Sequence, residues 1–182
     1  MNASETRHTI FKTRWGHFGF ICRDDSVCRT LLPVGKQTIA REALLAGHPS
    51  PASDTPYEKD LRRGLQQRII AYFEGENVDF STDPVVDLTR FSVFQRAVLT
   101  ACRRIGPGCT RTYGELAADA RHTKAARAVG GAMARNPVPL IVPCHRVVQA
   151  GGRLGGFSAI GGTPLKQRMI QLERQVWESQ DG

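Results

Sequence analysis

The chain lacks a hydrophobic run long enough to cross a membrane. Its longest apolar stretch, residues 138–144, is interrupted by Pro139 and Pro143, whereas a membrane-spanning helix needs about 20 apolar residues. Residues 1–5 contain no apolar stretch of the kind found in secretory signals. The five cysteines are an odd number at irregular spacing, which does not suggest a disulfide framework. We therefore expect a cytoplasmic protein with reduced thiols.

Acidic residues are scarce, but only in one half of the chain. The 182 residues carry 25 Lys or Arg and 17 Asp or Glu, a net charge of +8. Residues 1–91 hold 12 of each kind, whereas residues 96–168 hold 12 basic residues and only 2 acidic ones. This asymmetry indicates that one part of the molecule binds a polyanion or an acidic membrane surface.

The overall composition is that of a folded protein. A hydrophobic content of 41% and a charged content of 23% are enough for a core and exclude a disordered polyelectrolyte. A length of 182 residues fits one large domain or two small ones.

The first 35 residues predict a small antiparallel sheet. Phe18, Phe20 and Cys22 occupy alternate positions, and residues 24–26 (DDS) are a turn signal before an apolar run at residues 27–32. Strands joined by such short turns pair in an antiparallel manner.

A connection, a helix and a loop are predicted next. Residues 46–57 contain three prolines and no regular period, so we expect an exposed connection. A helix is predicted over residues 58–74, with Gly75 beyond its end and an acidic loop at residues 74–87. The apolar face of this helix comprises Leu61, Leu65, Ile69, Ile70 and Phe73.

Where the charge balance changes, a helix with a clear start signal is predicted. Ser92 and Gln95 have the spacing of a capping box, in which each side chain bonds the other residue's backbone N–H. Gly106 and Pro107 end this helix.

Two shorter helices are predicted to follow. Thr112 and Glu115 form a second capping box, for a helix that runs to about Ala120. Thr123 is in position to cap a third helix over residues 124–134. Two short helices joined by a tight turn in a basic background are typical of a helix-turn-helix, although such pairs also serve as plain packing units.

Residues 137–148 (PVPLIVPCHRVV) combine an apolar character with three prolines. Because proline fixes φ and lacks an N–H donor, this cannot be an ordinary central strand. We expect a rigid, partly extended, buried segment that holds Cys144 in one place. Six glycines within residues 151–162 predict a loop whose backbone can approach a ligand closely.

The last helix is predicted to start at Thr163 and Pro164, which are suited to the cap and the first turn. Its predicted apolar face comprises Leu165, Met169, Leu172 and Val176. Glu173 lies beside that face.

A cysteine followed directly by a histidine has three interpretations. The commonest is a buried structural thiol beside a hydrogen-bonded histidine. Metal binding is a second, but no further Cys or His lies at ligand spacing, so we expect no metal. The third is a nucleophilic thiolate, with His145 as its base and Glu173 as the group that orients the base. A carboxylate beside an apolar face is costly unless it is paired, which favours that role for Glu173.

Residues 143–147 (PCHRV) resemble the active-site signature of the O6-alkylguanine-DNA alkyltransferases, also called methylated-DNA–protein-cysteine methyltransferases. Further motifs of the family occur here in the same order and spacing, and the resemblance covers roughly residues 90–175. These motifs are residues 112–117 (TYGELA), 126–130 (ARAVG), 136–137 (NP), 155–158 (GGFS), and Lys166 followed by Glu173.

The resemblance implies an α+β fold with two domains. Residues 1–88 would form an RNase H-like scaffold, a small antiparallel sheet with a helix. Residues 89–182 would form a mostly helical domain that carries a helix-turn-helix and both binds DNA and performs the chemistry.

The resemblance also implies the reaction. Such a protein transfers a methyl or other alkyl group from O6 of guanine, with O4 of thymine as a further candidate, to Cys144. The transfer is irreversible and happens once per molecule, without a cofactor. In this family His145 deprotonates the thiol through a water, Glu173 stabilises the imidazolium, and Asn136 orients the network. Tyr113 would donate a hydrogen bond to N3 of the departing guanine.

The remaining implied roles concern binding. The Ser158 N–H would bind O6, the carbonyls of Cys144 and Val147 would accept the exocyclic amine, and Arg127 would replace the extruded base in the stack. The expected partner is double-stranded DNA, bound in the minor groove independently of sequence by a monomer in the cytoplasm, or in the nucleus of a eukaryote, and no membrane. Weaker candidates are His122 for a backbone contact and Met133, Pro139 and Phe157 for the pocket lining.

Some features depart from the family pattern. Phe157 occupies a position where tyrosine is common, residues 159–162 extend a loop that is shorter in some members, and the N-terminal zinc site of some members is not recognisable. Two alternative functions are a lesion-binding protein without catalysis, which the presence of Cys144 disfavours, and a Cys-His hydrolase, which leaves the basic half unexplained.

Overall fold

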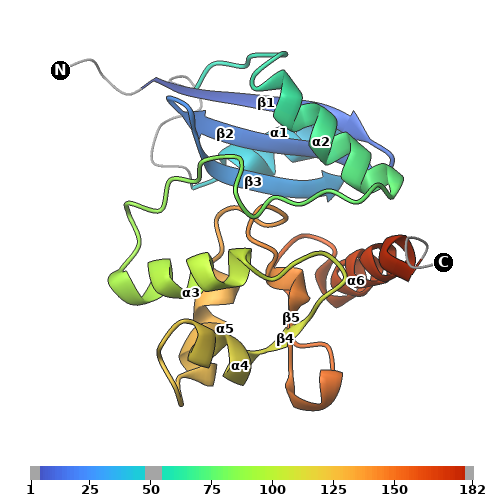
Figure 1. The fold of residues 1–182 in the computed structure, drawn as a ribbon. Helices are drawn as coiled ribbons and strands as arrows, with labels where there is room; N and C mark the ends of the chain where they lie inside the picture. The colour runs from blue at the N-terminus through green and yellow to red at the C-terminus, as the bar shows by residue number, and fades with distance from the viewer. Residues whose placement is uncertain (1–4, 48–54, 179–182) are drawn as a thin grey trace. The chain divides into compact units, whose positions relative to one another are not determined.

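The structure is a computed structural model that describes residues 5–47 and 55–178. It is an α+β protein that divides into two compact units (Figure 1). The first unit comprises Met1–Val78 with Pro84–Asp87, and the second comprises Asp79–Asp83 with Leu88–Gly182. The chain therefore passes between the units more than once, whereas the sequence predicted a single boundary after residue 88.

The first unit contains the predicted antiparallel sheet. Strands β1 (Thr6–Thr13), β2 (Gly16–Arg23) and β3 (Ser26–Val34) pair in the order β1-β2-β3. The turn predicted at residues 24–26 joins β2 to β3, with Asp24 at a positive φ of 51°. The sheet prediction is confirmed.

Both faces of this sheet are covered. On one face, Ile10 and Ile21 pack with Ala40 and Leu44 of helix α1 (Gln37–Leu45). On the other face, the ring of Phe18 contacts the ring of Phe73 from helix α2 (Arg63–Glu74), with centroids 6.1 Å apart. Because side chains alternate across a strand, residues Phe18 to Cys22 are all buried. Helix α1 was not predicted from the sequence.

The segment before α2 differs from its prediction. The helix begins at Arg63 rather than at residue 58, because residues 57 and 58 run beside β1. The Glu58 N–H donates to the His8 carbonyl, and Arg62 then adopts a left-handed conformation with φ 46°. Of the connection predicted as exposed, residues 48–54 lie outside the described residues, and Thr55 is fully buried. Gly75 ends the helix as predicted, at φ 95°.

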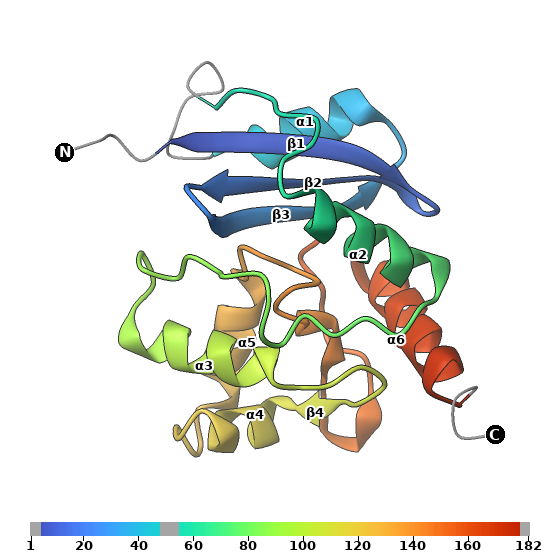
Figure 2. The ribbon, with the colours of Figure 1, turned by 45° about the horizontal axis from the view of Figure 1, so that its top comes forward.

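The second unit is mostly helical (Figure 2). Both predicted capping boxes are present, Ser92 with Gln95 and Thr112 with Glu115. Its elements are α3 (Val93–Arg103), β4 (Arg111–Thr112), α4 (Tyr113–Asp119), α5 (Ala126–Ala134), η2 (Cys144–Arg146), β5 (Val147–Val148), η3 (Ala150–Gly152) and α6 (Gly162–Glu178).

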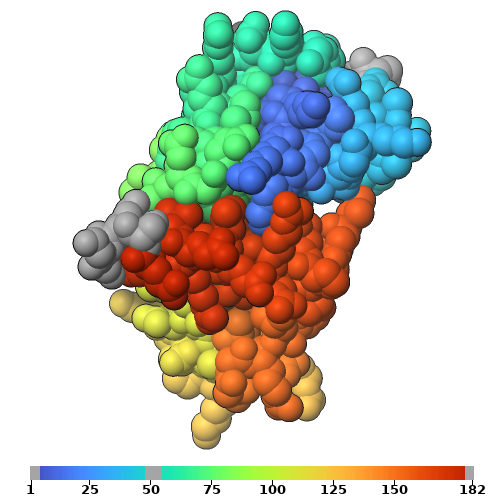
Figure 3. Space-filling view, turned by 90° about the vertical axis from the view of Figure 1, so that its right-hand side faces the viewer, coloured from blue at the N-terminus to red at the C-terminus, as the bar shows by residue number. Residues whose placement is uncertain are grey.

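Two helix starts in this unit differ from the prediction. Thr123 does not cap α5, because Lys124 takes a positive φ of 68° and the helix begins after Ala125 without a side-chain cap. Helix α6 begins at Gly162, before Thr163 and Pro164. Figure 3 shows the outer side of α6 at the surface of the second unit.

Candidate active site and nucleic-acid interface

The proline-rich segment is buried, as predicted, and ends at Cys144. Val138, Leu140, Ile141 and Val142 are all at most 1% exposed. The Cys144 N–H donates to the Val142 carbonyl, and Cys144–Arg146 then form a 3₁₀ turn rather than continuing an extended chain. The prolines leave this segment few conformations, so the thiol has a well-defined position.

A short parallel pairing joins this segment to the start of α4. Arg111 pairs with Val147 and Thr112 with Val148. Because β4 leads directly into Tyr113 and β5 directly follows residues 144–146, this pairing brings Tyr113 and Cys144 to one cavity. A two-residue strand carries no recognisable period, and the sequence did not predict it.

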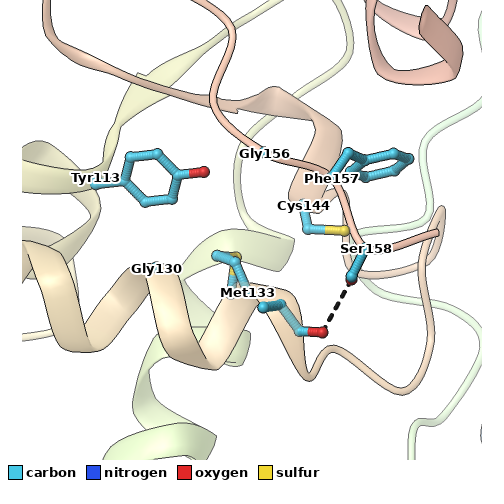
Figure 4. A pocket seen from close by; sticks show the side chains of 8 residues that line it. Tyr113, Gly130, Met133, Cys144, Gly156, Phe157 and Ser158 are labelled. Carbon is cyan, nitrogen blue, oxygen red and sulfur yellow. Dashed lines mark hydrogen bonds between the residues drawn. The ribbon is translucent and has the colours of Figure 1, made fainter. Parts of the chain in front are cut away.

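The cavity has a volume of about 370 Å³. Its lining residues are Tyr113, Gly130, Met133, Ala134, Cys144, Gly156, Phe157 and Ser158. Figure 4 shows the Tyr113 hydroxyl and the Cys144 side chain from separate elements at this cavity. Five predicted site residues thus line it, whereas Pro139 and Val147 do not. The side chain of Ser158 donates to the Ala134 carbonyl at 2.9 Å, which links the glycine loop to the end of α5.

Glycine at position 155 leaves room for the tyrosine. A Cβ at Gly155 would lie 2.7 Å from the Tyr113 hydroxyl oxygen, closer than such atoms normally approach. Burial and the nearby Cys144 raise the pKa of Tyr113. Its hydroxyl therefore keeps its proton and can act as a donor into the cavity.

The Cys144 thiol is only 7% exposed. Burial raises the pKa of Cys144, whereas the Asn136 side chain and the charge of Lys166 act in the opposite direction. Asn136 is itself held in place, because its side chain donates to the Val142 carbonyl at 2.7 Å and accepts from the Val138 N–H at 3.1 Å. Asn136 thus connects the end of α5 to the segment that carries the thiol.

His145 and Glu173 form a buried pair. His145 Nε2 lies 2.7 Å from Glu173 Oε1, and His145 is fully buried. Burial lowers the pKa of His145, and Glu173 acts in the opposite direction. The other ring nitrogen, Nδ1, is buried without a hydrogen-bond partner among the described residues. The imidazole is therefore oriented through one nitrogen, while the other remains able to exchange a proton.

The sequence missed two basic residues of this site. The Arg146 guanidinium contacts both carboxylate oxygens of Glu173 at 2.9–3.2 Å. Although burial alone would raise the pKa of Glu173, His145 and Arg146 hold it well below its ordinary value. Lys166 is fully buried and donates to the Val147 carbonyl at 2.6 Å.

The signal for Lys166 was a different face of the last helix. The buried residues of α6 are Lys166, Met169, Ile170 and Glu173, at spacings of three and four. Of the predicted apolar face, only Met169 is buried. An apolar count cannot find a face on which two of the four residues are charged. The spacing of Lys166 and Glu173, seven residues apart, could have suggested it.

The candidate nucleic-acid interface lies on α4, α5 and their connection. Arg127, in the first turn of α5, is exposed and has no hydrogen-bond or ion-pair partner within residues 5–47 and 55–178. His122 lies in the connection, with its ring edge against Phe94 at a centroid distance of 4.9 Å. Arg121 and Lys124 flank it, both at positive φ. These basic side chains have few acidic neighbours.

Neither a metal cluster nor a membrane-spanning helix occurs in the part of the chain that the structure describes. No cluster of three or more His, Cys, Asp or Glu side chains there could hold a metal ion. No helix there has both the length and the apolar character needed to cross a membrane. All five cysteines are free thiols.

Comparison with known proteins identifies the family. Residues 93–175 match the model of the DNA-binding domain of 6-O-methylguanine DNA methyltransferase. The methylated-DNA–protein-cysteine methyltransferase of Mycolicibacterium paratuberculosis is 37% identical over 153 residues, which are 83% of this chain and 90% of that protein. The protein of the same name from Methanosarcina acetivorans is 41% identical over 63% of this chain and 70% of its own length.

Solved structures agree with the sequence relatives. The crystal structure of Mycobacterium tuberculosis OGT in complex with DNA matches with a TM-score of 0.75 at 30% identity, covering 93% of this chain and 94% of that one. The O6-methylguanine-DNA methyltransferase of Pyrococcus kodakaraensis matches with a TM-score of 0.71 at 25% identity, covering 91% and 98% of the two chains. The chain belongs to the family of methylated-DNA–protein-cysteine methyltransferases.

Proposed function

We propose that this protein repairs alkylated DNA by direct reversal, transferring a methyl or other alkyl group from O6 of guanine to Cys144. The observation that carries this proposal is a buried thiol at a cavity of about 370 Å³, next to a hydrogen-bonded His145–Glu173 pair. The product is a stable thioether. Each molecule therefore acts once.

The bond changes balance without a cofactor. The sulfur of Cys144 forms a bond to the alkyl carbon, the bond from that carbon to O6 breaks, and its electron pair stays on guanine. The thiol proton passes through a water to His145 Nδ1, the ring nitrogen without a partner among the described residues. Tyr113 donates a hydrogen bond toward N3, where it stabilises the charge that develops on the leaving base.

Recognition of guanine is proposed to use backbone groups. The Ser158 N–H binds O6, and the carbonyls of Cys144 and Val147 accept the exocyclic amine, which adenine lacks at that position. The Val147 carbonyl already accepts from Lys166, but a carbonyl oxygen has a second lone pair. Met133 and Phe157 supply apolar walls at the cavity.

We further propose that α4 and α5 act as a helix-turn-helix in the minor groove, binding DNA without reading its sequence. An O6 atom inside a stacked duplex is out of reach, so the base must be extruded. The exposed guanidinium of Arg127 fills the place that the base leaves. His122 contacts the backbone, and the surplus of basic residues supplies affinity for phosphates that decreases as salt increases.

The first unit is proposed to be an RNase H-like scaffold, and the protein to act as a monomer in the cytoplasm with the chromosome. The five free thiols are consistent with a reducing compartment. A protein that transfers one group per molecule needs no second copy for its chemistry.

Intact mass measurement tests the transfer. The protein is incubated with an excess of duplex oligonucleotide that contains one O6-methylguanine. We expect every molecule to gain the mass of one methyl group and then no more. Cys144→Ser should abolish the transfer, by at least about 1000-fold, because a neutral hydroxyl is a far weaker nucleophile.

The control variant is Cys109→Ser, which removes an exposed thiol of the same unit and should leave transfer unchanged. Lesion binding by the wild type without any mass change would instead indicate a non-catalytic lesion-binding protein. The absence of both binding and transfer would contradict the proposal and favour the alternative function of a Cys-His hydrolase.

A further inference from the structure

Arg146 has an unusual environment for an arginine. It is 3% exposed, and its guanidinium lies against Glu173 through Nε and Nη2. Its Nη1 donates to the carbonyl of Ile105, just beyond the end of α3. An arginine is seldom so deeply buried, since removing its charge from water is costly unless a partner compensates it.

Glu173 has two ionisable partners, His145 and Arg146, and its Oε2 also accepts from the Gly108 N–H at 3.4 Å. Its Oε1 lies 2.7 Å from His145 Nε2 and 2.9 Å from Arg146 Nη2. Both contacts use the same oxygen, and Oε2 accepts from Arg146 Nε at 2.9 Å. His145 therefore faces a compensated ion pair rather than a bare carboxylate.

Charged groups reach His145 from two elements. Helix α6 contributes Glu173 and Lys166, and the turn η2 contributes Arg146 next to it in the chain. The neutral thiol of Cys144 belongs to the same turn, and that of Cys102 comes from α3. Two cations thus oppose one carboxylate. A bare carboxylate at this distance would favour a charged imidazole, which could not accept a proton.

We propose that Arg146 is a positioning residue that offsets the charge of Glu173 and so, together with burial, keeps His145 neutral in the resting protein, ready to take the proton of Cys144. The purpose assigned to Arg146 rests on the proposed function, whereas its effect on the charge of His145 does not. Glu173 orients the imidazole, and Arg146 prevents that same carboxylate from charging it too early.

A purely structural role would have different consequences. If Arg146 only tied η2 to the end of α3 through Ile105, its loss would lower stability and slow transfer equally at every pH. If it sets the charge of His145, its loss also moves the pH at which His145 titrates. The titration of His145 therefore separates the two roles.

The test is the NMR titration of the histidine ring in the full chain labelled at histidine, with His145 assigned through His145→Gln. We expect Arg146→Met to raise the titration midpoint of His145 by about one pH unit or more, because Glu173 then lacks the one cation in direct contact with it. Arg146→Lys, which keeps the charge, should return the midpoint toward that of the wild type. An unchanged or lowered midpoint in Arg146→Met, or a Lys variant that behaves as the Met variant does, would overturn the proposal.

The matched control is an ion pair of the first unit. Arg23→Met removes the partner of Asp87 in the first unit, a pair at 2.8 Å, and should not move the His145 midpoint. If Arg146→Met does not fold, Glu173→Gln is compared with the double variant Arg146→Met/Glu173→Gln, which leaves no Glu173 charge buried without its arginine. The double variant should have the higher midpoint, and an equal or lower one would overturn the proposal.

Transfer rates then connect the titration to the proposed function. In Arg146→Met the rate should fall at pH 6–7 and recover as the pH rises, because His145 must lose its extra proton first. A wild type that transfers no alkyl group would contradict the proposed function, while the NMR midpoints would still decide the role of Arg146.

Discussion

The two units differ in the polar groups that they bury. The polar residues buried in the first unit are uncharged or neutral at rest, while four residues buried in the second unit form a cluster of ionisable side chains. The first group is Thr6, His8, Thr9, Thr13, Thr30, Thr55 and Gln66, and the second is His145, Arg146, Lys166 and Glu173. Buried charge is costly. Among the described residues it is concentrated around the thiol that is proposed to react.

The buried thiols of Cys22 and Cys144 also differ in their surroundings. In the first unit, burial raises the pKa of Cys22 to about 12 although the charges of Arg62 and Arg7 act in the opposite direction, and the thiol is fully buried. In the second unit, Lys166 and Asn136 oppose the effect of burial on Cys144. A buried thiol is inert by default. Cations oppose burial at both thiols, and Cys144 differs in having the Asn136 side chain beside its sulfur.

The largest effect on this contrast is expected from Lys166→Met, which removes a buried cation beside the thiol. We expect transfer at pH 7 to slow by about 10- to 100-fold, because loss of a nearby cation raises a thiol pKa by about one to two units. The rate should recover as the pH rises. Transfer assays that are quenched at set times and repeated across a range of pH measure this rate.

Lys166→Arg keeps the positive charge and is the control for charge. Lys12→Met removes a positive charge elsewhere and is the control for position. Lys12 is an exposed residue of the first unit, and its replacement should change nothing. An equal loss at every pH for Lys166→Met would contradict an electrostatic role.

Arg127→Ala removes an exposed charge of the second unit. Its effect is compared with that of Lys166→Met, which removes a buried one. We expect transfer from duplex DNA to slow by about tenfold, because the Arg127 side chain offsets only a part of the few kcal/mol that extruding a base from the stack costs. Transfer from a free O6-alkylguanine base should not change. The control is Arg174→Ala, an exposed arginine of α6. Equal losses with duplex and free base would refute this role.

The smallest expected effect is on the stability of the first unit at acidic pH. Burial lowers the pKa of His8, so the unfolded chain takes up the proton first as the pH falls below about 6.5. Stability present above that value is lost toward the lower pKa of the folded state, about 1 kcal/mol between pH 7 and 5. His8→Gln should remove this part of the pH dependence.

The measurement uses Trp15, whose ring lies 5.3 Å from that of Phe73 in the first unit. Denaturant unfolding is followed by its fluorescence in a Trp177→Phe background, at pH 7 and pH 5. If His8→Gln loses as much stability as the parent between these values, the burial of His8 does not explain the acid sensitivity.

Local signals predicted part of this fold well. The capping boxes at Ser92 and Thr112 are in place, because each depends only on residues three apart. The start of α5 was wrong, since Lys124 takes a left-handed conformation that no local signal marks. Helix α1 was missed because Lys36 makes no side-chain cap and its first turn has no acidic residue.

The site was predictable where family motifs exist and not where partners meet through the fold. The residues alone offered a nucleophilic Cys144 with His145 and Glu173 as one of three interpretations, and the resemblance selected it. The pairing of β4 with β5 and the contact of Arg146 with Glu173 join residues far apart in the chain. Periodicity within one helix cannot show that Lys166 faces inward, because a lysine is normally solvated.

The contrast between the units is tested most directly by locating the transferred group among the five cysteines. After reaction with O6-methylguanine DNA, the protein is digested and the peptides that contain Cys22, Cys28, Cys102, Cys109 and Cys144 are compared by mass. We expect one methyl group, on the Cys144 peptide alone. A methyl group on any other cysteine, or on none, would contradict the account.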